Sequence, residues 1–244
     1  QTAYFASLYR HDEELTNKMS GYLSDYNVCQ CKGKGSLGKG TIIIGCREIK
    51  NVYIEGKAEL RYCSKLENGY IKSIDGNVFV GNDVMASDFV FMPGSQITNA
   101  AIIERCFVGE GTQIGNGFSA TDCVFCSNCQ AFHGEACSVF AGPFTVTHHK
   151  STLLIAGMFS FMNAGSNTNQ SNHYYRLGPN HEGILQRGSK TASGSYILWP
   201  AITGVFSLVK GKHGGNLDAR TLPFSYLIEQ NGETWIFPGM SLKS

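Results

Sequence analysis

The histidines are the residues most able to do chemistry at neutral pH, and five of the seven lie beyond residue 145. His148 and His149 are adjacent, and His173 ends a polar run. An imidazole is a suitable base for removing a proton from a hydroxyl or amine before it attacks a thioester carbonyl. Side chains alternate in direction along a strand, so one of His148 and His149 is expected to be buried and the other presented. We predict His148, His149 or His173 as a general base, with a structural or metal-binding histidine pair as the alternative.

Polar residues near these histidines have the groups needed to bind a hydroxylated or phosphorylated ligand. Asn172 belongs to the polar run 167–173 that ends at His173, and Asn163 precedes this run; both suit the hydroxyls of a sugar. Two short segments combine cations with glycine, which is the chemistry that holds a phosphate or pyrophosphate. The predicted phosphate-binding residues are Arg187, Ser189 and Lys190, with Lys212 and His213 as a second clamp. The alternative interpretation is that these segments are solvated turns.

Three cysteines at intervals of three residues, Cys123, Cys126 and Cys129, resemble a metal site. The next cysteine, Cys137, comes too late for the ferredoxin pattern. In a six-residue repeat, Cys123 and Cys129 project from different faces, and Cys126 and Cys106 point inward. We therefore expect structural thiols, with a metal or redox site as the alternative.

The composition limits the classes of protein to which the chain can belong. The 244 residues have a formal net charge of +1, which provides no basic field for nucleic acid. No run of 18 apolar residues is present, and charged residues occupy the first thirty positions where a signal peptide needs an apolar core. Nine cysteines, an odd number, suit a reducing compartment. We expect a cytoplasmic protein with no membrane and no nucleic-acid partner, and the start at Gln1 suggests a piece of a longer chain.

A short repeat dominates the sequence between about residues 72 and 165. Steps of six from Val78 to Phe132 place residues able to occupy a core at nearly every position, and 108–112 and 114–118 both read aliphatic, Gly, any residue, Gly. Such a repeat predicts a triangular parallel β-helix with 18-residue turns, because each six-residue side is one short strand. The expected inward columns are Val78, Gln96, Ile114 and Phe132; Val84, Ile102, Ala120 and Ser138; and Val90, Val108, Cys126 and Phe144.

These repeats resemble the hexapeptide-repeat, left-handed β-helix superfamily. The resemblance implies an acyltransferase-like protein, commonly a trimer, that uses a histidine on the coil surface. The segments 145–173, 187–201 and 222–229 are also similar to an uncharacterised Bacteroides-type family of large β-helical proteins of unknown function. That second resemblance implies a fold and a lineage but no activity.

Two further elements flank the repeats. Apolar residues at spacings of three and four over 4–27 predict an amphipathic helix that covers the end or flank of the β core. The Asn231-Gly232 pair between β-prone runs predicts a C-terminal hairpin. The predicted organisation is a helix and a Gly/Lys-rich connector in 1–40, a β-helix with inserted polar loops in 41–222, and a hairpin flap in 223–244.

The sequence thus predicts an all-β, left-handed parallel β-helix with one N-terminal helix and a C-terminal β-hairpin. The predicted function is transfer of an acyl or acetyl group from an acyl-CoA donor to a sugar or sugar nucleotide in a homo-oligomer, a trimer by the resemblance. Two alternatives stay open. One is a non-catalytic β-helical scaffold or carbohydrate-binding module, and the other is a zinc-dependent, carbonic-anhydrase-like hexapeptide protein.

Overall fold

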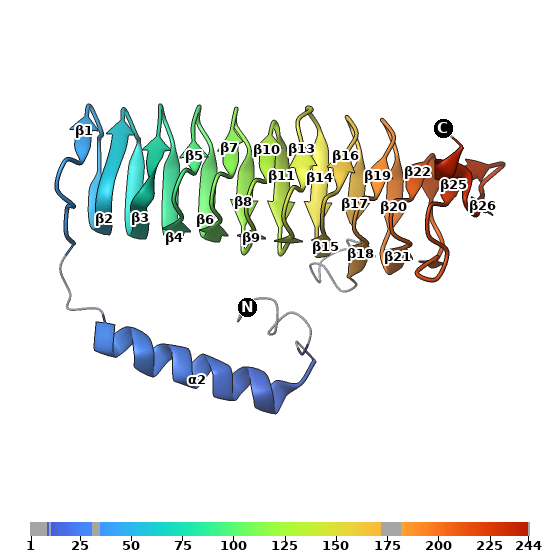
Figure 1. The fold of residues 1–244 in the computed structure, drawn as a ribbon, viewed down its shortest axis with the longest axis horizontal. Helices are drawn as coiled ribbons and strands as arrows, with labels where there is room; N and C mark the ends of the chain where they lie inside the picture. The colour runs from blue at the N-terminus through green and yellow to red at the C-terminus, as the bar shows by residue number, and fades with distance from the viewer. Residues whose placement is uncertain (1–8, 10, 31–34, 172–181, 244) are drawn as a thin grey trace.

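The chain forms a parallel β-solenoid that runs the length of the molecule (Figure 1). The computed structural model describes residues 9, 11–30, 35–171 and 182–243. About ten turns follow one another along a single axis, with one helix near the N-terminus, so the predicted left-handed parallel β-helix is confirmed.

Each turn has three sides, and strands from successive turns pair in parallel to form three faces. Face A consists of β5 (Gln96–Ile97), β7 (Gln113–Gly115), β10 (Gln130–Phe132), β13 (Val146–Thr147), β16 (Asn163–Ala164), β19 (Lys190–Thr191), β22 (Leu208–Lys210) and β25 (Tyr226–Gln230). Face B consists of β8 (Ser119–Thr121), β11 (Gly134–Cys137), β14 (Thr152–Ile155), β17 (Asn169–Ser171), β20 (Tyr196–Leu198) and β23 (Lys212–His213). Face C consists of β9 (Val124–Phe125), β12 (Phe140–Ala141), β15 (Gly157–Phe159), β18 (Gly183–Leu185), β21 (Ala201–Thr203) and β24 (Leu217–Asp218).

The first turns use longer strands that bend around the corners. These are β2 (Ile49–Arg61), β3 (Lys65–Val80), β4 (Met85–Phe91) and β6 (Ile102–Val108), and β1 (Ile42–Ile44) pairs with the end of β2. At the other end, β26 (Glu233–Phe237) and the short helix η1 (Met240–Leu242) follow β25.

The turns contain 17 residues in the regular part of the solenoid, not the predicted 18. Gln96 pairs with Gln113, and Gln113 pairs with Gln130. The predicted 18-residue columns are therefore wrong: Ile102 is 44% exposed and Phe144 is 46% exposed, although both were expected in the core. The column that actually points inward on face A joins Val80, Ile97, Ile114, Ala131, Ala164 and Val209, all of them buried.

The corners explain the shorter turn. Residues with positive φ recur every five or six positions, as at Arg105, Gly111, Asn116, Asp122 and Asn128. A left-handed residue turns the chain sharply at little cost when it is Gly or Asn, which is why these residues recur in the sequence. Two six-residue sides and one five-residue side give a turn of 17, so a strict six-residue frame loses register after one turn.

The core inside the triangle changes in chemistry along the axis. Up to about residue 140 it is mostly aliphatic, whereas later turns bury hydroxyl residues such as Thr168, Ser189, Ser195 and Ser225. Several of these hydroxyls donate hydrogen bonds to the carbonyl three residues before, as Ser225 does to Leu222 at 2.8 Å. Burial of these hydroxyls is tolerated because such bonds offset the loss of contact with water.

Helix α2 (Glu13–Gln30) lies within the predicted helical region but does not pack as expected. It begins after Asp12, whose Oδ1 accepts a hydrogen bond from the Leu15 N–H at 2.9 Å, as an N-cap residue does. Tyr22 is 75% exposed and Leu23 is 46% exposed, so this side of the helix does not cover the β core. Figure 1 shows the helix apart from the solenoid. The prediction of a packing element was therefore wrong for the described side chains of α2.

The C-terminal hairpin forms as predicted. Strands β25 and β26 pair antiparallel, with Gln230 opposite Glu233 across the Asn231-Gly232 turn. Strand β25 also pairs in parallel with β22, so the hairpin grows out of the last turn. Among the described residues, no helix is long and apolar enough to cross a membrane.

Candidate functional site

Face A brings together three of the residues predicted from the sequence. Val146 pairs with Asn163, and Asn163 pairs with Lys190, so these positions occupy three successive turns of one face. His148 comes directly after β13, which ends at Thr147. Neighbouring parallel strands lie about 4.8 Å apart, so Asn163 is about 5 Å and Lys190 about 10 Å along the axis from the His148 strand.

His148 has the environment expected of a neutral, usable base. Its side chain is exposed, and Nε2 lies 2.5 Å from Oε1 of Gln130 in the preceding turn. Partial burial, followed by the neighbouring His149, holds the pKa of His148 below its ordinary value. An amide oxygen accepts hydrogen bonds, so Gln130 places the proton on Nε2 and leaves Nδ1 as the proton acceptor. The ring also lies 5.7 Å from the ring of Phe132, which limits its orientation.

His149 is exposed at the corner after β13, and both histidines are therefore presented, against the expected burial of one. The backbone carbonyl of His149 accepts a hydrogen bond from Thr152 Oγ1 at 3.2 Å, which fixes the corner. The two rings lie 6.4 Å apart. The expectation of alternation fails because the strand ends at Thr147 and the chain already turns at His149.

Two cations lie at the end of this face. Lys190 is exposed on β19, and the guanidinium of Arg187 lies 5.0 Å above the ring of Phe161 at the corner that precedes it. A pocket of about 400 Å³ adjoins them, and Lys190, Phe206, Phe224 and Tyr226 contribute to its lining. Asn163 and Lys190 lie on face A, His148 follows its strand β13, and Arg187 lies at the corner where this face begins; we call these four residues the face-A cluster.

Other predicted residues lie elsewhere. Ser189 is fully buried, and its hydroxyl shares a hydrogen bond with Thr203 Oγ1 at 3.0 Å, because it points inward while Lys190 points outward. Lys212 is exposed on face B, so it does not join the face-A cluster. Asn172 and His173 lie outside the described residues.

His213 is buried and has a structural role. Its Nδ1 lies 2.8 Å from Thr234 Oγ1 on β26, and its Nε2 lies 3.2 Å from the carbonyl oxygen of Lys210. A carbonyl oxygen only accepts, so Nε2 carries the proton and Nδ1 accepts from the Thr234 hydroxyl. The neutral ring therefore ties the hairpin to the last turns, and it is not presented to a ligand at the surface.

This contact makes the stability of the C-terminal turns dependent on pH. Burial lowers the pKa of His213, whereas in the unfolded chain an imidazole takes up a proton near a pH of about 6.5. The unfolded chain then binds more protons at acid pH, so stability is full above about pH 6.5 and falls as the pH falls. We expect the urea midpoint of unfolding to drop between about pH 8 and about pH 5.5. A His213→Gln variant that keeps the full drop would contradict this assignment.

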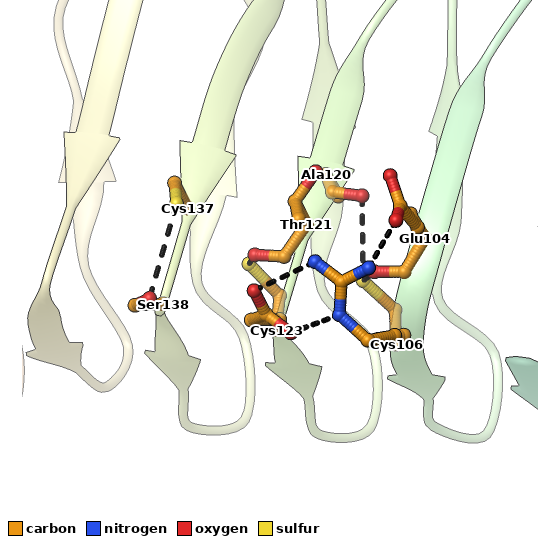
Figure 2. A network of polar contacts seen from close by, with 9 residues as sticks. Glu104, Cys106, Ala120, Thr121, Cys123, Cys137 and Ser138 are labelled. Atoms are coloured by element: carbon orange, nitrogen blue, oxygen red, sulfur yellow. Dashed lines mark hydrogen bonds and ion pairs between the residues drawn. The ribbon is translucent and has the colours of Figure 1, made fainter. Parts of the chain in front are cut away.

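The cysteines are placed differently from the prediction. Cys106, Cys123 and Cys129 are buried, and Cys126 is only half-buried, because the 17-residue turn reverses the expected directions of Cys123, Cys126 and Cys129. The Cys123 thiol donates to the Thr121 carbonyl at 3.1 Å (Figure 2). Burial raises the pKa of the Cys129 thiol to about 12, and that of Cys123 is also raised. These groups are neutral thiols in the core, whereas metal ligands are thiolates.

The polar network around Cys106 and Cys123 extends from the buried thiols to charged side chains at the surface. The Cys106 thiol donates to the carbonyls of Glu104 at 3.1 Å and of Ala120 at 3.5 Å (Figure 2). Outside it, Arg105 forms a fork with the carboxylate of Asp122, at 2.6 and 3.0 Å, and also pairs with Glu104. These charges are about half exposed, so the ion pairs contribute little to stability. Within the described part of the chain, no group of three or more His, Cys, Asp or Glu side chains is arranged to hold a metal ion.

Gly188 has a conformation and an environment that another residue does not fit. Its φ is +79°, and a Cβ there would lie 2.3 Å from Cδ1 of Phe206. We expect Gly188→Ala to cost about 1–3 kcal/mol, because alanine is strained at positive φ and displaces the ring. Chemical denaturation measures this cost. The matched change Gly194→Ala, also at positive φ but with nothing within 4 Å, should cost less, and equal losses would contradict the role of the Phe206 contact.

Sequence reasoning missed two residues of the site. Gln130 orients His148, and Phe161 supports Arg187. A signal for the first was present: Gln96, Gln113 and Gln130 recur every 17 residues and mark the outward column of face A. Phe161 had no comparable signal, because its place in a corner depends on the register of the turns.

The comparisons with known proteins bear on the family and leave the activity open. A family model described as "Domain of unknown function (DUF4954)" matches residues 1–244. No curated protein matches the chain. Two similar solved structures are the polySia specific acetyltransferase NeuO, with 11% identity over 84% of this chain and 83% of that chain and a TM-score of 0.20, and LpxA from Acinetobacter baumannii, with 11% identity over 84% and 76% and a TM-score of 0.22.

TM-scores of this size carry no argument about what the chain does. The match of the family model, by contrast, covers every residue. The chain belongs to the DUF4954 family.

Proposed function

We propose that this chain is an acyltransferase that moves an acyl or acetyl group from acyl-CoA to a hydroxyl or amine of a sugar or sugar nucleotide. The observation that supports it most is His148: an exposed imidazole, with a lowered pKa and an oriented Nε2, on the same face as Asn163 and Lys190. A base of this kind is useful only if a substrate proton comes within hydrogen-bond reach.

In the proposed reaction, Nδ1 of His148 takes the proton of the acceptor hydroxyl or amine as its oxygen or nitrogen attacks the thioester carbonyl. A tetrahedral intermediate forms, and its collapse breaks the carbon–sulfur bond and expels the coenzyme A thiolate. The imidazolium of His148 then returns the proton to that thiolate. One C–O or C–N bond forms, one C–S bond breaks, and the base is regenerated.

The remaining residues of the face-A cluster have binding roles in this proposal. Lys190 holds phosphate groups of the donor, and Arg187, at the corner where face A begins, binds an anionic group of the acceptor such as the phosphate of a sugar nucleotide, because ammonium and guanidinium groups bind such oxygens strongly. The side chain of Asn163 offers both a donor and an acceptor to a sugar hydroxyl. His149, Asn172, His173 and Lys212 stay predictions, and Ser189 and His213 are left out because they are buried.

The outer surface of face C supports the prediction of a homo-oligomer. One outward column on this face is apolar in successive turns: Phe107, Val124, Phe140, Met158, Ile184 and Ile202. Contiguous apolar surface of this kind is typical of protein interfaces. A trimer and a cytoplasmic location stay part of the proposal.

A non-catalytic carbohydrate-binding module is the second candidate, favoured by the row of exposed aromatic rings beside the face-A cluster. The two candidates differ in whether thiol is released. With acetyl-CoA and a panel of sugars, amino sugars and sugar nucleotides, the transferase produces free coenzyme A in step with acceptor modification. Acceptor modification without a change in acetyl-CoA, or no turnover by the folded chain, would overturn the transferase.

A substitution that removes one positive charge tests whether Lys190 contacts the donor. We expect Lys190→Ala to raise the KM for acetyl-CoA with little change in kcat, because it removes a contact made equally in ground and transition states. Lys57→Ala, an equally exposed lysine in an early turn, is the matched control and should change neither constant. Equal effects of the two substitutions would remove Lys190 from the proposed donor site.

A further inference from the structure

A row of phenylalanine side chains follows one corner of the solenoid, where the chain passes from face C to face A. Phe144, Phe161, Phe206 and Phe224 occupy this corner in the later turns, and we call them the aromatic corner. Ring centroids are 6.1 Å apart for Phe144 and Phe161, 6.5 Å for Phe161 and Phe206, and 5.5 Å for Phe206 and Phe224. The first three rings remain 46%, 45% and 40% exposed, so they form a continuous aromatic strip at the surface.

The fold itself does not require aromatic residues at this corner. In earlier turns the same corner is occupied by Gly94, Gly111 and Asn128, and the N–H groups of Gly111 and Asn128 donate to the preceding turn as those of the phenylalanines do. All four phenylalanines have φ between +48° and +61°, a conformation that bulky side chains rarely adopt. Contacts between the rings, edge-to-face for the first two pairs and stacked for Phe206 and Phe224, offset part of this strain. Strain kept in successive turns at an exposed site points to a role for the rings in binding.

The row of rings is continuous although one turn has glycine, Gly188, at this corner instead of phenylalanine. Gly188 is the corner residue between Phe161 and Phe206, and the Phe206 ring lies over it, within reach of Phe161. The rings therefore follow the solenoid axis as a straight series. A linear chain of sugar rings has this shape, and the C–H faces of pyranose rings stack on aromatic faces.

The charge around the corner indicates what kind of sugar chain fits. Arg187 lies directly above the ring of Phe161, and Lys190 borders the pocket formed with Phe206 and Phe224. Residues 141–244 contain eight Lys and Arg against four Asp and Glu, whereas residues 41–140 contain seven against eleven. The aromatic corner thus lies in the basic half of the solenoid. A guanidinium matches the two oxygens of a carboxylate, so acidic sugars are favoured over neutral ones.

We propose that the aromatic corner, together with Arg187, binds a linear glycan whose sugars carry carboxylates. The rings contact successive sugars, and the guanidinium of Arg187 pairs with a carboxylate. This names the acceptor class for the proposed transferase, since the glycan would run beside the face with His148. This proposal rests on the proposed transferase only for the statement that the bound glycan is acylated. Glycan binding itself needs no acyl donor.

The test is calorimetric titration of the full chain with an oligogalacturonate of six sugars, without any acyl donor. A neutral glucan hexamer and a single-stranded oligonucleotide are titrated in parallel. We expect saturable binding of the oligogalacturonate that weakens with added salt. Equal binding of the neutral glucan, stronger binding of the oligonucleotide, or no binding to any of them would overturn the proposal.

Substitutions by asparagine test the rings without removing the corner. Asn128 shows that asparagine is accepted there, so Phe161→Asn and Phe206→Asn should fold. We expect each to weaken oligogalacturonate binding about tenfold, equivalent to about 1.4 kcal/mol. Tyr62→Asn removes an exposed ring, also at positive φ, from a corner of an early turn and should bind as the wild type does. Wild-type affinity in both folded corner variants would overturn the role of the rings.

Titration with acetyl-CoA distinguishes a failure of the glycan-binding proposal from a failure of the proposed transferase function. Corner variants that lose the glycan but bind acetyl-CoA normally support the aromatic corner as the glycan site. Wild-type protein that binds the glycan but not acetyl-CoA also supports it, and counts against the transferase alone. Arg187→Gln should narrow the preference for oligogalacturonate over the neutral glucan, and an unchanged preference would exclude Arg187 from the site.

Discussion

We expect His148→Ala to lower the rate of acyl transfer by about 10²–10⁴-fold, the usual contribution of a positioned general base. The acceptor would still bind, because Asn163 and Arg187 remain, so the loss should appear mainly in kcat. Single-turnover measurements with saturating acetyl-CoA show this directly. His133→Ala, at a corner one turn before the His148 strand, is a matched control and should retain full activity. An unchanged rate of acyl transfer in a folded His148→Ala variant would show that His148 is not the general base.

The lowered pKa of His148 predicts how the rate of acyl transfer depends on pH. Partial burial and the neighbouring His149 lower the pKa of His148, so the base stays neutral to a lower pH than a free imidazole. We expect kcat/KM to be constant at neutral pH and to fall only on the acid side. His149→Gln removes one of the two causes, so the pKa of His148 rises and the acid limb should move to higher pH. A limb that stays in place would show that the titrating group is another residue.

The largest effect on stability is expected at Trp199, the largest fully buried side chain. Its Nε1 donates to the Ile155 carbonyl at 2.6 Å, and its ring lies over Gly183, where a Cβ would come within 2.1 Å. Trp199→Ala leaves a cavity and an unpaired carbonyl, so we expect a loss of about 3–5 kcal/mol. Urea denaturation followed by circular dichroism measures it.

Trp199→Phe is the matched control, because it keeps a six-membered aromatic ring in the core and removes the five-membered ring with its N–H donor. It should lose clearly less than Trp199→Ala. Contacts in a solenoid are mainly between neighbouring turns, so hydrogen exchange should increase first in β15, β18 and β21. Equal losses in the two variants, or exchange raised uniformly along the chain, would contradict this packing.

The fold could be predicted because the residues that form the corners of each turn are recognisable in the sequence. Left-handed corners need Gly, Asn or Asp at little cost, and Gly111, Asn116 and Asp122 recur at the required spacing. The number of residues per turn could not be obtained from the short repeat, because one side has five residues where six were assumed. The columns, and the directions of the cysteines, were wrong for that single reason.

The candidate site was predictable in part. His148, Asn163 and Lys190 were each chosen for their chemistry, but their grouping depends on register: 17 residues separate Val146 from Asn163, and 27 separate Asn163 from Lys190. The longer interval contains residues 172–181, so no periodic rule aligns these turns. Alternation on a strand explains why Ser189 points inward beside an exposed Lys190. His213 is buried for the same reason, next to Lys212.

The packing of helix α2 was not predictable from its periodicity. Spacings of three and four place apolar residues on one side of a helix, but they do not specify the surface it contacts. Tyr22 and Leu23 both stay exposed in the structure. Helix formation itself follows from the local signals, since Asp12 caps the first turn and Glu14 pairs with Lys18 at 2.6 Å.

The measurement that tests the central claim most directly is calorimetric titration of the full chain with acetyl-CoA and with coenzyme A. If the face-A cluster is a donor site, binding is saturable at micromolar strength, about −8 kcal/mol, and Lys190→Ala weakens it. A folded chain that binds neither compound, or that binds both equally well with and without Lys190, would contradict the assignment of face A as the site of acyl transfer.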